Sequence, residues 1–312
     1  MTAWLDDLAA LEVAHAHAQH VARAWIASDA RRWVSDRFDT VPHGDAEAAA
    51  AVAEELLSTT DWIGELLAPL VGALGEDHLF EPPLRVHRDP LRTGVILLDH
   101  PAVSISATVT SADALADLPP PQSVVVPGRL AVVRYHRAEG AVLRRWKAAP
   151  VGQRFSAADE PPCRWAGEVP LANGVVLRCD GREYGTLFTG ARCDLVTITA
   201  TIRYAAAPLM REYALPAGGL LRTATLDEAA SRTAMLLTLL RLGGRPDAGA
   251  AFEAASHHSA FHLRWSAMRE WLALDVAAAL PRLRGMAVTD PDPDVRAAAH
   301  ATLRLAEQRL AA

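Results

Sequence analysis

The chain has 312 residues, of which 51% are hydrophobic and 22% charged, and its formal net charge is −6. This length and composition allow a full hydrophobic core and about two domains of about 150 residues each. Lys147 is the single lysine, so arginine carries almost all the positive charge, interspersed with Asp and Glu. No basic stripe results, which excludes nucleic acid as a primary partner.

No targeting or membrane segment is predicted. The start, Met1-Thr-Ala-Trp4, lacks the cationic and apolar regions of a signal peptide, and no window reaches about 18 uninterrupted apolar residues. We therefore expect a cytoplasmic protein with no membrane partner. Cys163, Cys179 and Cys193 are odd in number and form no CxxC motif, which argues against a disulfide framework and a thiolate zinc site.

Residues 1–80 are predicted to form an N-terminal helical region with three helices. Trp4, Leu5, Leu8 and Leu11 recur at helical spacing, and the Gly44-Asp45 pair favours a helix start before Ala46. Pro69 is expected to kink or end the third helix. The apolar faces of these helices would suit packing against the β region, against the C-terminal helices or over a partner site, and this choice stays open.

Residues 84–225 are predicted to be β-rich, because short β-branched runs alternate with turns containing Pro or Gly. The spacing of about 8 to 12 residues points to an antiparallel sandwich or barrel. Residues 103–109 and 196–204 alternate apolar with polar side chains, as expected of strands with one face on a core. The expected strands cover residues 95–98, 103–109, 123–126, 130–135, 141–146, 174–178, 184–188, 195–204 and 209–213.

In the number and length of its strands, this region resembles the double-stranded β-helix of the cupins. Cys179-Asp-Gly-Arg182 would form a hairpin turn in such a barrel. The resemblance implies a barrel that encloses a small molecule.

Residues 226–312 contain a predicted helical repeat. Arg232, Arg264 and Arg296 are spaced 32 residues apart, and apolar residues recur at fixed distances after each arginine. A stripe at the third, seventh and tenth positions after the arginine predicts helices buried against their neighbours. Its members are Met235, Leu239 and Leu242, then Ala267, Trp271 and Leu274, then Ala299, Leu303 and Ala306.

The segment Thr289-Asp-Pro-Asp-Pro-Asp-Val-Arg296 resembles the interhelical turn and second-helix start of HEAT repeats. The full pattern is present only in the last unit. The resemblance implies stacked helical hairpins over residues 226–312. The predicted fold is therefore α+β, with N-terminal helices, a central antiparallel cupin-like sandwich or barrel, and C-terminal HEAT-like hairpins, and no single family covers the whole chain.

Three histidine groups were weighed as metal ligands. His17 and His20 share a helical face without a suitable carboxylate, and His258 and His262 have the i,i+4 spacing of a zinc pair without its Glu. A cupin-type centre would draw on His87, Asp89, His100 and His136, since His87-Arg-Asp89 has a His-x-Asp spacing. We favour no cofactor, with a divalent transition metal as the alternative.

Two functional hypotheses follow. No GxSxG, GxxxxGK[ST] or strand-bound GxGxxG motif is present, so whether the chain is an enzyme stays open. The favoured hypothesis is a non-catalytic binding or accessory protein whose β domain and hairpins bind a peptide or protein. Arg and Trp anchor many interfaces, so the expected partner-binding residues are Arg264, Trp265, Arg269 and Arg296. The alternative is a cupin-like metal-dependent enzyme acting on a small molecule.

Overall fold

The computed structural model describes residues 3–77, 80–151 and 155–311, with side chains described for 12–77, 80–151 and 155–305. Trp4, Leu5, Leu8, Leu11 and Ala306 lie outside the described side chains. The chain divides into two compact units, each presented by itself below. The first comprises Met1–Ala148 and Arg164–Ala206, and the second comprises Ala149–Cys163 and Ala207–Ala312.

The N-terminal region contains four helices over its described residues, where three were predicted. Asp45 begins one of them as expected, because its carboxylate accepts a hydrogen bond of 2.9 Å from the Ala48 amide. The helices are α1 (Ala3–Ile26), α2 (Asp29–Asp39), α3 (Ala46–Leu57) and α4 (Asp61–Glu76).

Pro69 does not end its helix, since α4 continues through it to Glu76, whereas the expected kink stays a prediction. Proline inside a helix costs about 3 kcal/mol. Burial of Trp62, Leu66 and Leu70 on one face of α4 offsets this cost. The indole of Trp25 also donates a hydrogen bond of 2.8 Å to the carbonyl of Leu66, which ties α1 to α4.

All nine predicted strands are present in the structure, and three more occur. Of these three, β1 is exposed along its whole length and β7 along most of it, so they lack the apolar alternation that marks a strand in sequence. The strands of the first unit are β1 (Arg85–Arg88), β2 (Arg92–Asp99), β3 (Val103–Thr110), β4 (Ser123–Val126), β5 (Leu130–Arg137), β6 (Val142–Lys147), β7 (Arg164–Pro170), β8 (Val175–Asp180), β9 (Tyr184–Thr189) and β10 (Leu195–Ile202), with a short helix α5 (Ala112–Ala116) after β3.

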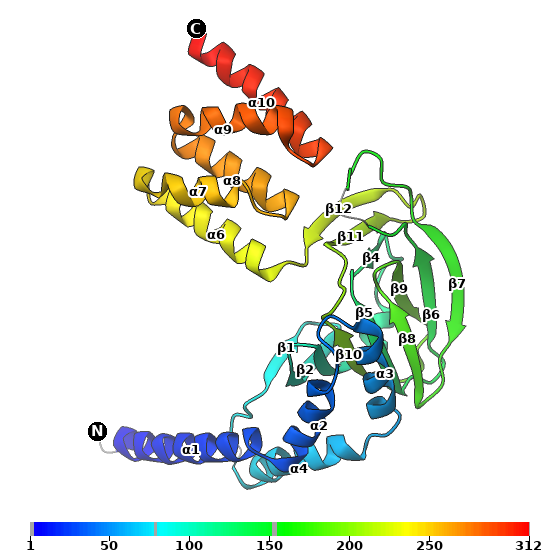
Figure 1. Cartoon of the computed structure of the whole chain (residues 1–312). Coiled ribbons are helices and arrows are strands. Elements are labelled where there is room, and N and C mark those ends of the chain that lie inside the picture. The colour runs from blue at the N-terminus through cyan, green and yellow to red at the C-terminus, as the bar shows by residue number, and fades with distance from the viewer. Residues whose placement is uncertain (1–2, 78–79, 152–154, 312) are drawn as a thin grey trace. The chain divides into compact units, whose positions relative to one another are not determined.

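Two antiparallel sheets organise this unit. One has six strands in the order β1-β2-β3-β10-β5-β8, and the other has three in the order β7-β6-β9. They remain separate sheets, so the predicted barrel is not closed. The fold is α+β with several antiparallel sheets, as the sequence predicted at this level (Figure 1).

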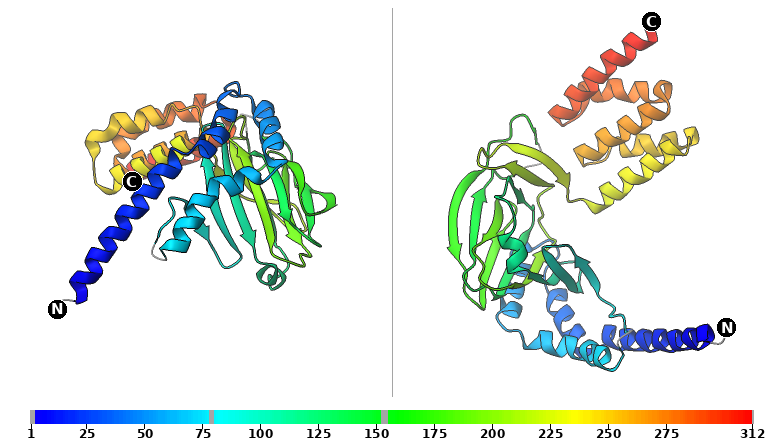
Figure 2. Two further views of the ribbon diagram at one scale, coloured as in Figure 1. Left: turned by 90° about the horizontal axis from the view of Figure 1, so that it is seen from below. Right: turned by 180° about the vertical axis from the view of Figure 1, so that it is seen from behind.

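The six-stranded sheet has one apolar and one more polar face. Val132, Ile198 and Ile105 belong to the face that shares a core with α2, α3 and α4. Residues one position away on the same strands, such as Val133, Thr197 and Thr199, line a cavity on the opposite face. Helix α3 contacts β5, β8 and β10, so the N-terminal helices pack against the β region (Figure 2).

The predicted hairpin at Cys179–Arg182 has a different role. β8 pairs with β5, whereas β9 pairs with β6, so the turn between β8 and β9 carries the chain from one sheet to the other. Gly181 is required there because an added Cβ would lie 2.5 Å from the carbonyl oxygen of Arg129.

The second unit contains an antiparallel strand pair followed by packed helices. Arg211 on the first of these strands is fully buried, and it donates hydrogen bonds to Glu160 (2.6 Å) and to the carbonyl of Ala149 (2.7 Å). These hydrogen bonds fix Ala149 and Glu160 to the strand pair. The elements are β11 (Leu209–Ala214), β12 (Leu220–Thr225), α6 (Glu228–Leu242), the 3-10 helix η1 (Pro246–Ala248), α7 (Gly249–Ala255), α8 (Phe261–Leu274), α9 (Val276–Thr289) and α10 (Pro293–Ala311).

Over its described side chains, the predicted apolar stripe is buried or half-buried in two units of the repeat and exposed in the first. Ala267 and Ala299 have no exposed surface, and Trp271 is 5% exposed. On α6, however, Met235, Leu239 and Leu242 are 64–68% exposed, which corrects the expectation for this helix. The reason is positional, because α6 is the first helix of the stack and no earlier repeat covers its face (Figure 1). Whether the hairpins are HEAT repeats stays a prediction.

No helix in the described part of the chain combines the length and apolar character needed to cross a membrane.

Candidate binding cavity between the two sheets

A cavity of about 320 Å³ lies between the two sheets of the first unit. This size is at the lower end of the range of about 300–1,000 Å³ for small-molecule sites. Five threonines and four arginines are among its lining residues. The charged residues in that lining are Arg92, Arg129, Arg145, Arg178 and Asp180.

Strand pairing arranges the inward side chains in layers along the cavity. On the three-stranded sheet, Leu143 lies between Phe188 and Val169, and two residues further along β6 Arg145 lies opposite Thr186. Tyr135 on the facing sheet contacts Phe188 edge-to-face, with ring centroids 6.0 Å apart. This end of the cavity, here called the apolar end, carries no charged side chain and contains the hydroxyl groups of Tyr135 and of Thr197, which pairs with Tyr135.

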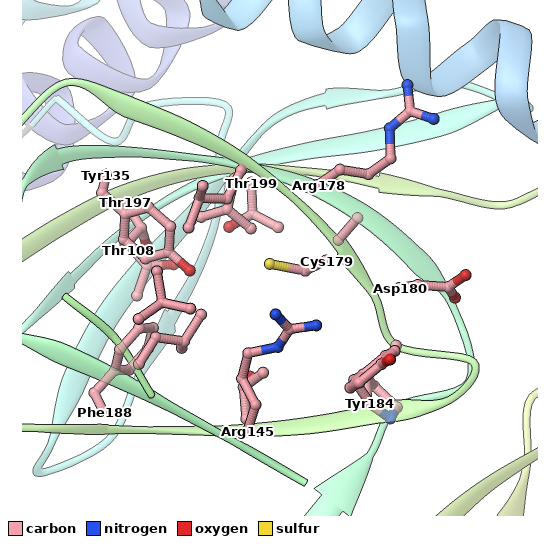
Figure 3. A pocket seen from close by; sticks show the side chains of 18 of the residues that line it. Thr108, Tyr135, Arg145, Arg178, Cys179, Asp180, Tyr184, Phe188, Thr197 and Thr199 are labelled. Atoms are coloured by element: carbon pink, nitrogen blue, oxygen red, sulfur yellow. The ribbon is translucent and has the colours of Figure 1, made fainter. Parts of the chain in front are cut away.

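Figure 3 shows the same order of side chains. Tyr135 and Phe188 lie at one end, Tyr184 and Asp180 at the other, and Arg145 points into the space between. The layer of Leu143 and the layer of Arg145 are two residues apart on β6. They are therefore about 6.7 Å apart, because a strand rises by about 3.3 Å per residue.

Arg145 is the charged group most available to a ligand. Within the part of the chain that the structure describes, no carboxylate pairs with its guanidinium, which lies 4.5 Å from the centre of the Tyr184 ring. Its neighbour on β7 is Gly167, which contributes no side chain. A guanidinium presents several N–H donors in one plane and suits a carboxylate or phosphate.

Two further charged residues of the lining, Arg178 and Asp180, already have partners of opposite charge. Arg178 binds Glu54 and Glu47 on α3, with distances of 2.6–2.9 Å. The carboxylate of Asp180 is held by Arg182 at 2.7 Å, and the hydrogen bonds from Arg182 lower the pKa of Asp180. Asp180 is thus an ionised carboxylate whose negative charge is balanced by the positive charge of Arg182. It therefore does not oppose an anion in the cavity.

Cys179 and Tyr135 face the cavity from neighbouring strands. Burial raises the pKa of the Cys179 thiol, while a hydrogen bond from the Tyr135 hydroxyl and the charge of Arg145 act in the lowering direction. Burial likewise raises the pKa of Tyr135. Both groups are therefore neutral near pH 7 and can serve as hydrogen-bond donors to a ligand.

The residues suggested for a cupin-type metal centre do not converge. His87 is exposed on β1 and lies 3.3 Å from Asp89. The Nε2 of His100 donates a 3.0 Å hydrogen bond to the carboxylate of Asp39 on α2, because its Nδ1 accepts from the Ala102 amide. His136 is exposed on β5, one residue from the inward-facing Tyr135. The described residues contain no group of three or more His, Cys, Asp or Glu that could hold a metal. The cavity lining, which includes no histidine among these residues, does not fit the donor set of such a centre.

His258 and His262 lie at the junction of α7 and α8. His258 precedes α8, where its Nδ1 accepts a hydrogen bond of 3.1 Å from the Ala260 amide, and His262 belongs to the first turn. Burial lowers the pKa of His262. His17 and His20, on α1, likewise join no metal-binding group of the described chain.

The predicted partner-binding residues occupy different environments. Arg264 is 5% exposed and binds both oxygens of Asp290, at 2.6 and 2.9 Å, whereas Arg269 is exposed and Trp265 is half-buried. Arg296 is half-buried and donates to the carbonyl of Asp290. Arg264 makes the equivalent bond to the carbonyl of His258, also six residues earlier in the chain. Partner binding stays a prediction for these residues.

No sequence motif marks the residues that line the cavity. Arg145, Tyr135 and Cys179 come from separate strands and form no local motif. In the sequence, these residues differ from their neighbours only in lying at alternate positions of predicted strands. Alternation shows that residues share one face of a strand, but it does not show what that face encloses.

Comparisons with known proteins give no family. No family model and no curated protein matches the chain. Solved structures that were matched include a sugar phosphate isomerase from a cupin superfamily of Silicibacter pomeroyi, with 13% identity, a TM-score of 0.25, and coverage of 44% of this chain and 78% of that chain. A cupin 2 conserved barrel domain protein from Rhodopseudomonas palustris is matched at 11% identity with a TM-score of 0.26, over 49% of this chain and 84% of that chain.

Hydroxypropylphosphonic acid epoxidase from S. wedmorenis is matched at 15% identity with a TM-score of 0.26, over 55% of this chain and 96% of that chain. All three TM-scores are well below 0.5. These likenesses therefore carry no argument about the activity or substrate of this protein.

Proposed function

We propose that the first unit binds a small organic anion in the cavity between its two sheets. The observation that carries the proposal is the guanidinium of Arg145, which faces this cavity and has no carboxylate partner among the described residues. A charged group in such a place is stabilised when an opposite charge binds beside it. The proposal keeps the small-molecule part of the enzyme hypothesis and involves no metal.

The surroundings of Arg145 support an organic rather than a simple inorganic anion. Thr186 and Thr199 supply hydroxyl groups near the charge, while Val133 and Leu177 supply apolar surface in the same layer. Sites of this kind combine an apolar lining with a few polar groups that orient the ligand.

A calorimetric titration of the full chain tests the proposal. The probes are acetate, butanoate, hexanoate and inorganic phosphate, with hexanamide as the neutral counterpart of hexanoate. We expect at least one anion to bind, and we expect Arg145→Gln to weaken its binding at least tenfold. Arg144→Gln is the matched control, because Arg144 precedes Arg145 on β6 but stacks on Trp165, 4.9 Å from the ring centre, outside the cavity lining.

Alkylation of Cys179 gives a second readout that does not need tight binding. Iodoacetate is anionic and iodoacetamide is neutral, so an anion site beside the thiol favours the first reagent. We expect the iodoacetate-to-iodoacetamide rate ratio at Cys179, relative to the ratio at Cys193, to fall several-fold in Arg145→Gln. Equal ratios in both proteins, together with no Arg145-dependent binding of any probe, would overturn the proposal.

A further inference from the structure

We infer that the ligand of this cavity is an amphipathic monocarboxylate whose carboxylate lies at Arg145 and whose apolar chain points toward Leu143 and Phe188. The inference rests on the proposed function and adds the chemical class and orientation of the ligand. It follows from the separation of charged and apolar side chains along the cavity, which strand pairing determines.

The apolar end can accept a chain without a second charge. Leu143 is flanked across the sheet by Phe188 and Val169, and Tyr135 faces Phe188 from the other sheet. Beyond this layer, a buried apolar cluster containing Ala138, Leu171 and Leu195 closes the space. A carboxylate here would lose its hydration without meeting a cation, which is strongly unfavourable.

The position of Arg145 determines the orientation. Its guanidinium lies over the ring of Tyr184, which is two residues from Thr186 and four residues from Phe188 along β9. Its positive charge also acts to lower the pKa of Cys179. Arg145 therefore directs its charge away from the apolar end (Figure 3). A ligand with its carboxylate at this charge can extend its chain along Val133 and Leu177 toward Leu143.

The apolar end also contains hydroxyl groups, those of Thr197 and, opposite it on the neighbouring strand, Tyr135. The hydroxyl of Tyr135 faces the cavity and is neutral, because burial raises its pKa. It can donate to a carbonyl or hydroxyl oxygen carried by the chain, in place of its hydrogen bond to Cys179. The class inferred is thus a short-chain monocarboxylate, with or without an uncharged oxygen on the chain.

A homologous series of ligands tests this inference in the full chain. From acetate through butanoate to hexanoate, we expect affinity to rise by about fourfold for each methylene that enters the apolar end. Adipate, with the same chain length as hexanoate and a second carboxylate, is expected to bind at least tenfold more weakly. Octanoate should bind no better than hexanoate once the cavity is filled.

Val133→Thr is the matched variant, because it keeps the shape of the side chain and adds a hydroxyl to the apolar wall. It should lower the ratio of hexanoate affinity to acetate affinity several-fold. Val109→Thr is the control, since Val109 is 43% exposed and does not line the cavity. Thermal unfolding of both variants shows whether they are folded.

The outcomes separate this inference from the proposal on which it rests. If no anion binds in a manner that depends on Arg145, the proposed function fails, and the inference with it. If anions bind through Arg145 but affinity does not change with chain length, or adipate equals hexanoate, only the inference is overturned. Rising affinity with chain length that Val133→Thr reduces supports both.

Discussion

Arg145 and Arg264 show how the surroundings of one residue type decide its role. Arg264 is buried with both oxygens of Asp290 bound to it, and it also donates to the carbonyls of His258 and Ser259 at 3.0 and 2.9 Å. All three nitrogens of its guanidinium thus donate hydrogen bonds within the protein, which indicates a structural role. Arg145 has no such acceptors among the described residues and faces a cavity.

Removing Arg264 should destabilise the second unit strongly. Arg264→Leu leaves the Asp290 carboxylate buried and without its cation, which typically costs about 3–5 kcal/mol of unfolding free energy. Arg269→Leu is the control on the same helix, because Arg269 is exposed and its loss should change the unfolding free energy by at most about 0.5 kcal/mol. Urea unfolding of both variants measures the difference, and similar losses would contradict the structural role of Arg264.

The same pair predicts a dependence of stability on pH. Burial alone would raise the pKa of Asp290, but hydrogen bonds from Arg264 and the Asp292 amide outweigh it and leave the pKa lowered. Stabilisation by a group with a lowered pKa is present above the unfolded value of about 3.9 and is lost as pH falls through the folded pKa. The stability advantage of the wild type over Asp290→Asn should therefore be full at pH 7 and shrink below about pH 4. A constant difference from pH 7 to pH 3 would count against this coupling.

At the scale of elements, residue alternation predicted the strands but not the use of their faces. The polar residues of β10 suggested a solvent-facing side, yet Thr197 and Thr199 line the cavity. Ile198 and Ile202, on the apolar side, share a core with the N-terminal helices. Alternation establishes that a strand has two different faces, and tertiary packing determines what covers each one.

Equivalent positions of the helical repeat should differ in their effect on stability. Trp271 is 5% exposed and stacks on Phe252, with ring centroids 6.4 Å apart, while Leu239, at the same repeat position on α6, is 64% exposed. We expect Trp271→Ala to cost about 3–5 kcal/mol of unfolding free energy. Leu239→Ala should cost about 0.5 kcal/mol or less. Chemical unfolding provides the comparison, and a large loss for Leu239→Ala would show that its face is covered in solution.

For the whole molecule, the cavity lies within one of two compact units, each with its own buried core. A ligand that binds only the folded state stabilises it by about 2.7 kcal/mol at 100 times its dissociation constant. With hexanoate at that concentration, amide hydrogen exchange should slow by up to about 100-fold in β3, β5 and β10. Exchange in α8 and α9 should stay unchanged. Slowing confined to those helices would place the binding site elsewhere.

Much of the fold could be predicted from local sequence. The strands, the helix start at Asp45, and the helices carrying Arg264 and Arg296 follow from alternation, capping and helical periodicity. Local rules failed at Pro69 and on α6. At Pro69, burial of one helix face outweighed the cost of proline, and α6 lacks a neighbour that would cover its apolar stripe.

The sequence by itself determined where most helices and strands form, because hydrophobic period and turn chemistry act over a few neighbouring residues. Only the tertiary structure decided that Arg145, Tyr135 and Cys179, from three different strands, face one cavity, and that His87, His100 and His136 do not. The physical reason is that strand pairing and the facing of two sheets depend on contacts between residues far apart in the chain. Those contacts leave no pattern at any fixed spacing in the sequence.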